Sequence, residues 1–297
     1  MINDTCHFIG GDYMKIGFLT NSLTWEGLKN LDEIADWAVK NGFEDLEVGP
    51  TIPLDEKLFS EIKDSGKIDI SALIYCRNFL DEDEEIAQNH QENLKARIEF
   101  AGKLGIKKVI CSTGVTQEAF AGMRYDPEKS IEAVVELFKT FIELAEKNNI
   151  KLCIENCPMM GNIAISPYIW EILFDRLDSD RIGLAFDPSH MVWQMMEPYE
   201  PIKEFGHKIF HVHAKDTEVL RHNLNKVGIL HNITEETKFF KHQWWRHRLP
   251  GLGDIQWNKI IANLEEIGYD GTISIEHEDP VWQGSLEKVQ KGILKAK

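Results

Sequence analysis

Cysteine is scarce in this sequence, and its spacing excludes two common stabilising devices. The 297 residues contain five cysteines, an odd number, and no two of them form a CxxC pair. A disulfide framework or a zinc ribbon would need paired spacings, so neither is expected. A reducing, cytoplasmic setting is the default expectation for such a chain.

Long apolar runs and clusters of basic residues are also missing. No run approaches the roughly 20 apolar residues that span a bilayer. The first residues, MINDTCHFIGGDY, lack the basic start and apolar stretch of a signal peptide, so we expect residues 1–13 to form an extension outside the fold. Asp and Glu number 49 against 33 Lys and Arg, and the net charge is −16. This balance argues against nucleic acid or an anionic membrane as the main partner.

The chain does contain a regular alternation of short β-rich runs and amphipathic helical stretches. Strands are predicted at residues 15–20, 45–49, 68–76, 107–114, 151–156, 181–187, 208–216 and 271–279. Helices are predicted at residues 28–42, 55–65, 83–105, 126–149, 166–176, 199–207, 256–267 and 284–295. In the fourth of these helices, Asp126 is the expected N-cap and Pro127 the first helical residue.

This strict alternation predicts a single α/β domain over residues 14–297, folded as a (β/α)8 TIM barrel. The alternative is a doubly wound sheet, which favours a glycine-rich phosphate loop after its first strand. The run IGFLTNSLTWEG contains no GxGxxG, so we favour the barrel.

One segment interrupts the alternation. About forty residues between Asp216 and Trp257 show no clear strand, and we expect a long insertion after strand seven at about 217–250. Its aromatic and apolar content argues against disorder. It is either a surface subdomain or oligomer contact, or a lid over the site. The sequence leaves open whether the chain is a homo-oligomer.

Acids and a histidine stand at the ends of the last four predicted strands. These residues are Glu155 in IEN, Asp187 in FDPSH, His213 in HVHAKD and Glu276 in ISIEHED. The C-terminal strand ends of a barrel converge on one face, so we expect the four side chains to meet. Three buried carboxylates would repel one another unless a cation joins them. The donor set suits one divalent metal ion, Mn²⁺ first, with Mg²⁺, Co²⁺ or Zn²⁺ as alternatives.

Each of these residues also has an ordinary structural interpretation. Glu155 alone would be an ion-pair partner, and His213 alone a hydrogen-bonded interior histidine. His211 shares the strand face of His213 and is expected to pack or to support the centre from behind. Lys215 either contacts substrate or forms an ion pair with Asp216 or Glu218. The four strand ends taken together favour the metal site.

The motifs IEN, FDPSH, HVHAKD, RLPGLGDIQW and ISIEHED resemble the sugar phosphate isomerase/epimerase superfamily, whose members are xylose isomerase-like TIM barrels. The resemblance covers roughly residues 14–295. It implies that Glu155, Asp187, His213 and Glu276 match the family's metal ligands and that His190 matches a substrate-contacting histidine. Arg246 and Arg248, before the PGLG segment, match arginines that hold substrate oxygens. Ketose 3-epimerases carry HxGExxR after the strand-seven histidine, whereas HAKDTE here is more similar to inosose dehydratases and isomerases.

These features predict a metal-dependent sugar, sugar-phosphate or inosose isomerase or epimerase with a small-molecule carbohydrate substrate. A metal chelates a hydroxy-carbonyl group and stabilises the enediolate formed on proton removal. The resemblance implies that Glu155 and Glu276 act as base and acid. We expect His190, Lys215, Arg246 and Arg248 to bind substrate. The alternatives are a dehydratase or lyase acting on an inosose or keto-glycoside, an endonuclease IV-like repair nuclease, and a non-catalytic binding subunit.

Overall fold

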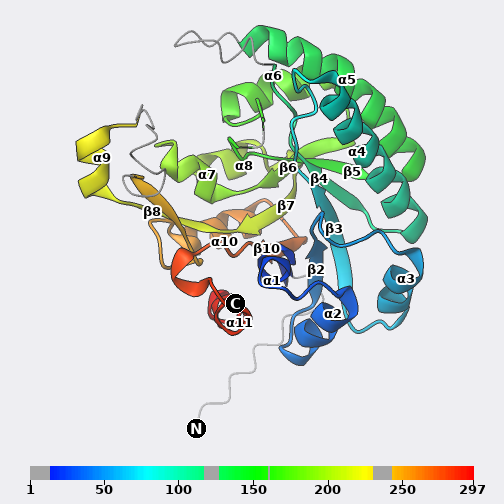
Figure 1. Cartoon of the computed structure of the whole chain (residues 1–297). Helices are drawn as coiled ribbons and strands as arrows, with labels where there is room; N and C mark the ends of the chain where they lie inside the picture. Colours follow the sequence, from blue (N-terminus) through cyan, green and yellow to red (C-terminus); the bar gives the residue numbers. More distant parts are fainter. Residues whose placement is uncertain (1–13, 117–126, 160, 230–242) are drawn as a thin grey trace.

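Eight parallel strands form a closed barrel in the computed structural model, which describes residues 14–116, 127–159, 161–229 and 243–297 (Figure 1). Around the barrel the strands follow the order β1, β10, β7, β6, β5, β4, β3, β2. Their bounds are β1 Lys15–Leu19, β2 Asp45–Val48, β3 Asp69–Tyr75, β4 Lys108–Cys111, β5 Lys151–Glu155, β6 Ile182–Phe186, β7 Ile209–Ala214 and β10 Thr272–Ile275. The predicted TIM barrel is confirmed, and each predicted strand overlaps an observed one.

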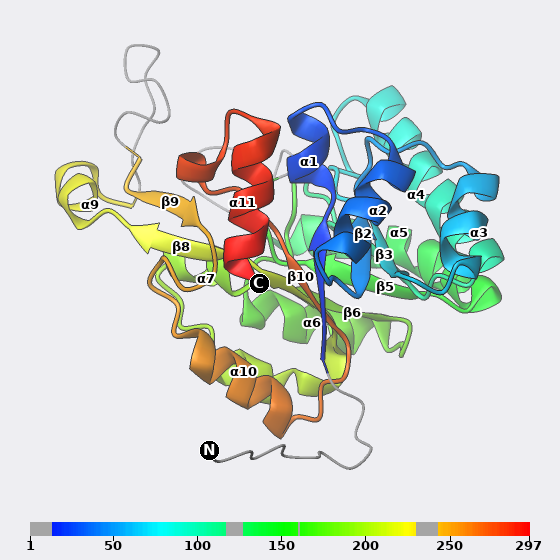
Figure 2. The same ribbon diagram turned by 90° about the horizontal axis from the view of Figure 1, so that it is seen from below.

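Helices surround the barrel, as Figures 1 and 2 show. They are α1 Asn21–Trp25, α2 Leu31–Lys40, α3 Glu56–Asp64, α4 Glu84–Leu104, α5 Pro127–Asn148, α6 Pro167–Leu177, α7 Pro188–Trp193, α8 Glu200–Glu204, α9 Arg221–Val227, α10 Trp257–Glu266 and α11 Leu286–Ala296. The Asp83 side chain accepts from two backbone amides at the start of α4, and Gly105 ends that helix with a φ of 69°. Such caps fix where an amphipathic helix begins and ends.

The apolar core of the described barrel has two main parts, and a third, smaller cluster holds Val219, Trp244 and Trp245. The larger part lies between strands and helices and contains large buried side chains such as Phe18, Phe138 and Trp170. The smaller part holds Leu19, Ala72, Ile74, Cys76, Ile110, Cys153 and Ala185. Several of its members are small. Polar side chains, among them Glu47 and His211, are fully buried as well.

The prediction that residues 217–256 contain no clear strand is wrong. Strand β8, Asp216–Val219, pairs antiparallel with β9, Trp245–Arg248, and α9 lies between them in the chain (Figure 2). Both strands are only four residues long, and WRHR shows no apolar alternation, so the periodicity of this hairpin is too weak to read. The short helices α1 and α7 were also not predicted.

Some expectations fall on residues outside the described ranges. These are the N-terminal extension at 1–13, the Asp126 N-cap and residues 230–242 of the insertion. Helix α5 begins at Pro127, as predicted. Cys76, Cys111, Cys153 and Cys157 are buried free thiols. Among the described helices, none combines the length and the apolar character needed to cross a membrane.

Candidate metal centre

The four predicted ligands meet at the C-terminal end of the barrel. Glu155 is the last residue of β5, Asp187 follows β6, His213 lies in β7 and Glu276 follows β10. One ligand atom from each residue lies within 4.8 Å of the others. The His213 Nδ1 atom is 3.3 Å from Glu155 Oε1 and 3.0 Å from Glu276 Oε2. Convergence follows from topology, because β5, β6, β7 and β10 are consecutive in the barrel.

The donor atoms at this point fit a divalent cation. Three of them, Asp187 Oδ2, His213 Nδ1 and Glu276 Oε2, are buried and make no regular hydrogen bond within the described part of the chain, although the Lys215 ammonium group lies 3.1 Å from Asp187 Oδ2 and 2.9 Å from Glu276 Oε2. Buried polar atoms without a hydrogen-bond partner are costly and rare. Three carboxylates and one imidazole suit Mn²⁺, Mg²⁺, Co²⁺ or Zn²⁺. We conclude that these residues could hold one metal ion.

Asp187 is oriented by the way its strand passes into helix α7. Its Oδ1 atom accepts a hydrogen bond from the Ser189 amide at 2.8 Å and so caps the helix, whose first residue is Pro188. The Asn156 side chain accepts the Asp187 amide at 2.8 Å and donates to the Asp187 carbonyl at 2.9 Å. The IEN and FDPSH segments therefore hold each other, and Asp187 Oδ2 faces the centre.

His213 is held by a residue that the sequence analysis missed. The buried Glu47 carboxylate of β2 accepts from His213 Nε2 at 3.1 Å and from His211 Nε2 at 2.9 Å. Burial lowers the pKa of His213, but Glu47 and Glu276 raise it well above its usual value. With a metal bound, Nε2 would keep its proton for Glu47 and Nδ1 would present its lone pair to the metal. Asp45 and Glu47 alternate with apolar residues in the run DLEV. That pattern places both acids on one strand face and was the available clue.

Charge in the centre is balanced by Lys215 and the histidines. The Lys215 Nζ atom lies 3.1 Å from Asp187, 2.9 Å from Glu276 and 3.4 Å from Glu278, so the expected pairing with Asp216 or Glu218 does not form. Burial lowers the pKa of Lys215, but Asp187 and Glu276 raise it well above its usual value. Burial raises the pKa of Glu47, yet His213 and His211 bring it well below the usual range.

His190, the predicted substrate contact, stands beside the centre. Its Nε2 atom is 3.3 Å from Asp187 Oδ2 and 3.7 Å from Glu155 Oε1. The indole N–H of Trp193 donates to His190 Nδ1 at 3.3 Å, so a neutral ring would carry its proton on Nε2. Burial lowers the pKa of His190, but Cys157 and Asp187 raise it to about 10, and Nε2 carries a proton in the charged ring as well. His190 therefore presents a donor to the site. A protonated Nε2 has no free lone pair, so it disfavours a second metal ion at the neighbouring group of Glu155, Cys157 and His190.

The β8–β9 hairpin reaches the edge of the site through aromatic contacts. Trp245 stacks on Trp193 with ring centres 4.7 Å apart, and the His247 Nε2 atom is 3.3 Å from Glu278. The two predicted arginines contact acids instead of the metal ligands. Arg246 bonds Glu218 at 2.7 Å, and Arg248 contacts Asp279 at 3.4 Å.

A cavity of about 230 Å³ opens beside the centre, and we call it the mouth cavity. Its charged lining is Arg77, Glu155, Lys215, Glu276 and Glu278. Trp25 and Met159, both partly exposed, belong to its apolar wall. A substrate in this cavity would contact two of the four ligand residues directly.

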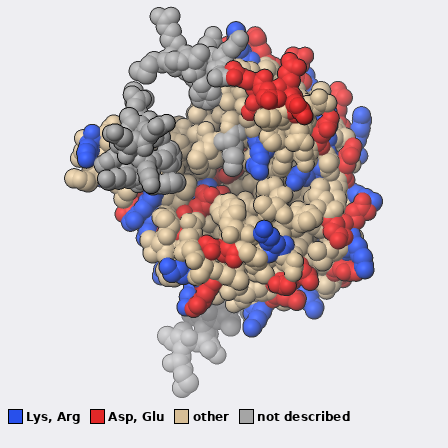
Figure 3. Space-filling view, in the orientation of Figure 1, with Lys and Arg blue, Asp and Glu red and all other residues tan. Residues whose placement is uncertain are grey.

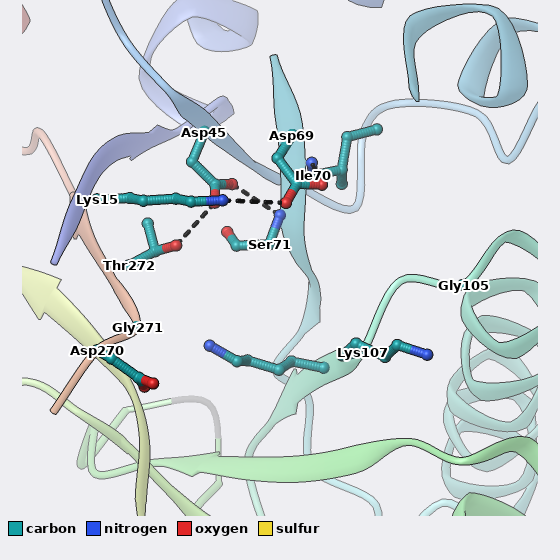
Figure 4. A pocket seen from close by; sticks show the side chains of 11 residues that line it. Lys15, Asp45, Asp69, Ile70, Ser71, Gly105, Lys107, Asp270, Gly271 and Thr272 are labelled. Carbon is teal, nitrogen blue, oxygen red and sulfur yellow. Dashed lines mark hydrogen bonds and ion pairs between the residues drawn. The ribbon is translucent and has the colours of Figure 1, made fainter. Parts of the chain in front are cut away.

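Another cavity, of about 200 Å³, lies near the opposite ends of the strands (Figure 4). Its polar groups bind one another: Asp45 accepts from Thr272 and from the Ser71 amide, both at 2.7 Å, and Lys15 lies 3.4 Å from Asp69. In TIM barrels this end serves stability and the C-terminal end serves chemistry. We therefore place the candidate site at the mouth cavity.

Comparison with known proteins agrees with this architecture. The chain is 28% identical over 302 residues to the uncharacterized protein YfiH of Bacillus subtilis, covering 90% of this chain and 93% of the relative. It is 24% identical over 260 residues to an inosose dehydratase of Clostridium perfringens, covering 83% and 82% of the two chains.

Solved structures share the fold. An IOLI protein with a binding zinc atom matches with a TM-score of 0.72 at 23% identity, over 95% of this chain and 96% of that one. A D-tagatose 3-epimerase-like protein matches with a TM-score of 0.69 at 23% identity and the same coverage. The model of the family described as xylose isomerase-like TIM barrel matches residues 35–295. The chain therefore belongs to the xylose isomerase-like TIM barrel family.

Proposed function

We propose that this protein is a divalent-metal-dependent enzyme that removes a proton next to a carbonyl group of a carbohydrate, and that it is an isomerase or epimerase. One observation carries the proposal. Two carboxylates, Glu155 and Glu276, flank the same imidazole nitrogen of His213 at 3.3 and 3.0 Å, in a site that also contains Asp187. A pair of acids at one reacting carbon can take a proton from one face and return one to the other.

The residues of the site have separate roles in this proposal. A divalent metal held by Glu155, Asp187, His213 and Glu276 would polarise the substrate carbonyl and stabilise the negative charge that develops on its oxygen. Glu155 and Glu276 serve as base and acid, and His190 donates from Nε2 to a substrate oxygen. The oxygen-rich donor set makes Mn²⁺ our first expectation.

A dehydratase is the second candidate, and the position of Lys215 favours it. Loss of water needs an acid for the departing hydroxyl, and the Lys215 ammonium group lies 2.9 Å from Glu276 in the mouth cavity. Several relatives, at 23–25% identity, are named inosose dehydratases. The first step, proton removal beside a carbonyl, is the same in both candidates.

Two other classes have less support. An endonuclease would need a basic surface for DNA, but the net charge is −16. On the face shown in Figure 3, acidic side chains are spread among the others, and the described residues form no broad basic surface there. If the protein were a non-catalytic binding subunit, the pairing of Glu155 and Glu276 in one site would have no explanation.

The test is a proton-exchange screen. Keto-sugars, inososes and their phosphates are incubated with the Mn²⁺-loaded protein in deuterated buffer, and NMR follows each carbon-bound proton. We expect exchange in at least one compound, with an epimer or isomer as product, or an unsaturated product if water is lost. Glu155→Gln and Glu276→Gln should abolish exchange. Exchange that survives in both variants would overturn the roles of these residues, and no exchange in any compound would argue for a binding protein.

Arg246 and Arg248 remain proposals as substrate contacts. Each would have to leave a carboxylate partner, Glu218 for Arg246 and Asp279 for Arg248, to reach a ligand. Replacing each with Ala and measuring KM and kcat on the identified substrate separates the two roles. A raised KM with unchanged thermal stability supports binding, whereas lost stability with unchanged KM supports a structural role.

A further inference from the structure

The mouth cavity has a positively charged side that the proposed chemistry does not use. Arg77 follows β3 and lines this cavity together with Glu155 and Glu276. The Sγ atom of the preceding residue, Cys76, lies 3.3 Å from Glu155 Oε2. Arg77 therefore directly follows a residue whose side chain contacts a predicted metal ligand. A substrate that is held at the candidate metal centre and fills this cavity would lie close to Arg77.

Arg77 has no acidic partner in the described part of the chain. Its Nη1 atom donates to the Cys76 carbonyl at 2.6 Å, and its guanidinium group lies 5.2 Å from the centre of the Tyr75 ring. Lys215, in the same cavity, contacts three carboxylates. A chain with 49 acidic and 33 basic residues offers many partners for an arginine, so this lack of pairing is informative.

A second arginine lies behind the same wall. Arg97 is only 7% exposed, and its guanidinium group lies 4.2 Å from the centre of the Tyr75 ring. Its hydrogen bonds go to Asn93 and to the carbonyl of Pro50, a residue of the cavity wall, and not to any described carboxylate. Burial and the nearby Arg77 both lower the pKa of Arg97. An arginine this buried is usually paired with an acid, so the positive charge here is unbalanced.

We propose that the substrate of the mouth cavity carries an anionic group, a carboxylate or a phosphate, that Arg77 binds. The inference rests on the proposed function, because it assigns the far end of a molecule whose hydroxy-carbonyl end lies at the metal centre. A guanidinium group matches either oxyanion with two parallel hydrogen bonds. One Nη1 bond to Cys76 leaves the remaining donors of Arg77 available.

The experiment uses three hydroxamates that chelate the metal through the same two oxygens. Glycolohydroxamate is uncharged at its far end, its phosphate ester carries a phosphate, and malonic monohydroxamate carries a carboxylate. Calorimetry on the Mn²⁺-loaded full chain gives the Kd of each. We expect one anionic probe to bind about 10–100-fold tighter than the neutral one, since a charge-assisted hydrogen bond contributes roughly 1.5–3 kcal/mol. The tighter probe identifies the anion.

Arg77→Gln removes the charge and keeps a donor for the Cys76 carbonyl. It should abolish most of the preference and leave the neutral probe unchanged. Arg77→Lys keeps the charge without the paired geometry and should retain part of the preference; it decides the matter if Arg77→Gln does not fold. Arg181→Gln is the matched control, because Arg181 is bonded to Asn149 near the opposite ends of the strands. It should keep the full preference.

The outcomes separate this inference from the proposed function. If the neutral hydroxamate binds only with metal but neither anionic probe binds better, the anion site is wrong and the metal chemistry stands. The same holds if Arg77→Gln keeps the wild-type preference. If no hydroxamate shows metal-dependent binding, the proposed function fails, and the anion site fails with it.

Discussion

Asp187 uses its two carboxylate oxygens for different purposes. Oδ1 caps helix α7 through the Ser189 amide, and Oδ2 faces the candidate metal centre. The sequence predicts this residue because an acid closes an apolar strand. Glu47 was missed because it lies inside a strand and contacts residues 164 and 166 positions away. Such a contact depends on how the barrel closes, which no local pattern reports.

Glu47→Gln should weaken metal binding about 10–100-fold, the usual cost of losing a carboxylate behind a histidine ligand. A glutamine carries no negative charge, and its NH2 group replaces one of the two carboxylate oxygens that now accept from His213 Nε2, so His213 is oriented less firmly. A chelator competition titration gives the affinity. Asp45→Asn is the control, since Asp45 shares this strand face but bonds Thr272 and Ser71. Wild-type affinity in Glu47→Gln would contradict the role of Glu47.

The buried Asp45 carboxyl should also make the stability of the fold depend on pH. Burial raises the pKa of this carboxyl, and hydrogen bonds from Thr272 and Ser71 only partly offset the rise. The folded state then favours the protonated form, so ionisation costs stability above the unfolded pKa of about 3.9. The Tm of the wild type relative to Asp45→Asn should fall as the pH rises from about 4 towards 7. A relative Tm that rises instead would show that ionised Asp45 stabilises the fold.

At the scale of elements, the β8–β9 hairpin is anchored by a buried acid. Asp216 accepts hydrogen bonds from the Thr217, Gly251, Gly253 and Ile255 amides and from the Trp257 indole. The HAKD and PGLGDIQW segments therefore form one structural unit. Local patterns predict only an insertion here, because contacts that anchor it span 35 or more residues.

Asp216→Asn should destabilise the protein by roughly 3 kcal/mol or more. N–H donors face both carboxylate oxygens of Asp216, so the NH2 group of an asparagine would be placed against N–H donors on one side. Denaturant unfolding measures the change. Asp254→Asn is the matched control, because the Asp254 side chain accepts from the single Val219 amide and an asparagine oxygen can replace it. Equal losses in the two variants would contradict the anchoring role of Asp216.

At the scale of the whole molecule, the features that depend on order along the chain were predictable. The alternation of predicted strands and helices indicated the barrel. The C-terminal ends of its parallel strands lie at one face, so the convergence of Glu155, Asp187, His213 and Glu276 could be predicted as well. Features that depend on closure of the barrel were not. The contact of Glu47 with His213, and the lack of an acidic partner for Arg77 among the described residues, become visible only when distant strands are set side by side.

The central claim is that these four residues hold one divalent metal per chain. Elemental analysis of purified protein, reconstituted with Mn²⁺ and freed of unbound ions, tests it most directly when Glu155→Gln and Asp187→Asn are measured beside the wild type. Asp187→Asn is informative because asparagine can still cap α7 while it presents an amide to the metal. The account predicts one metal ion per wild-type chain and a large loss in both folded variants. Unchanged metal content in both variants would contradict it.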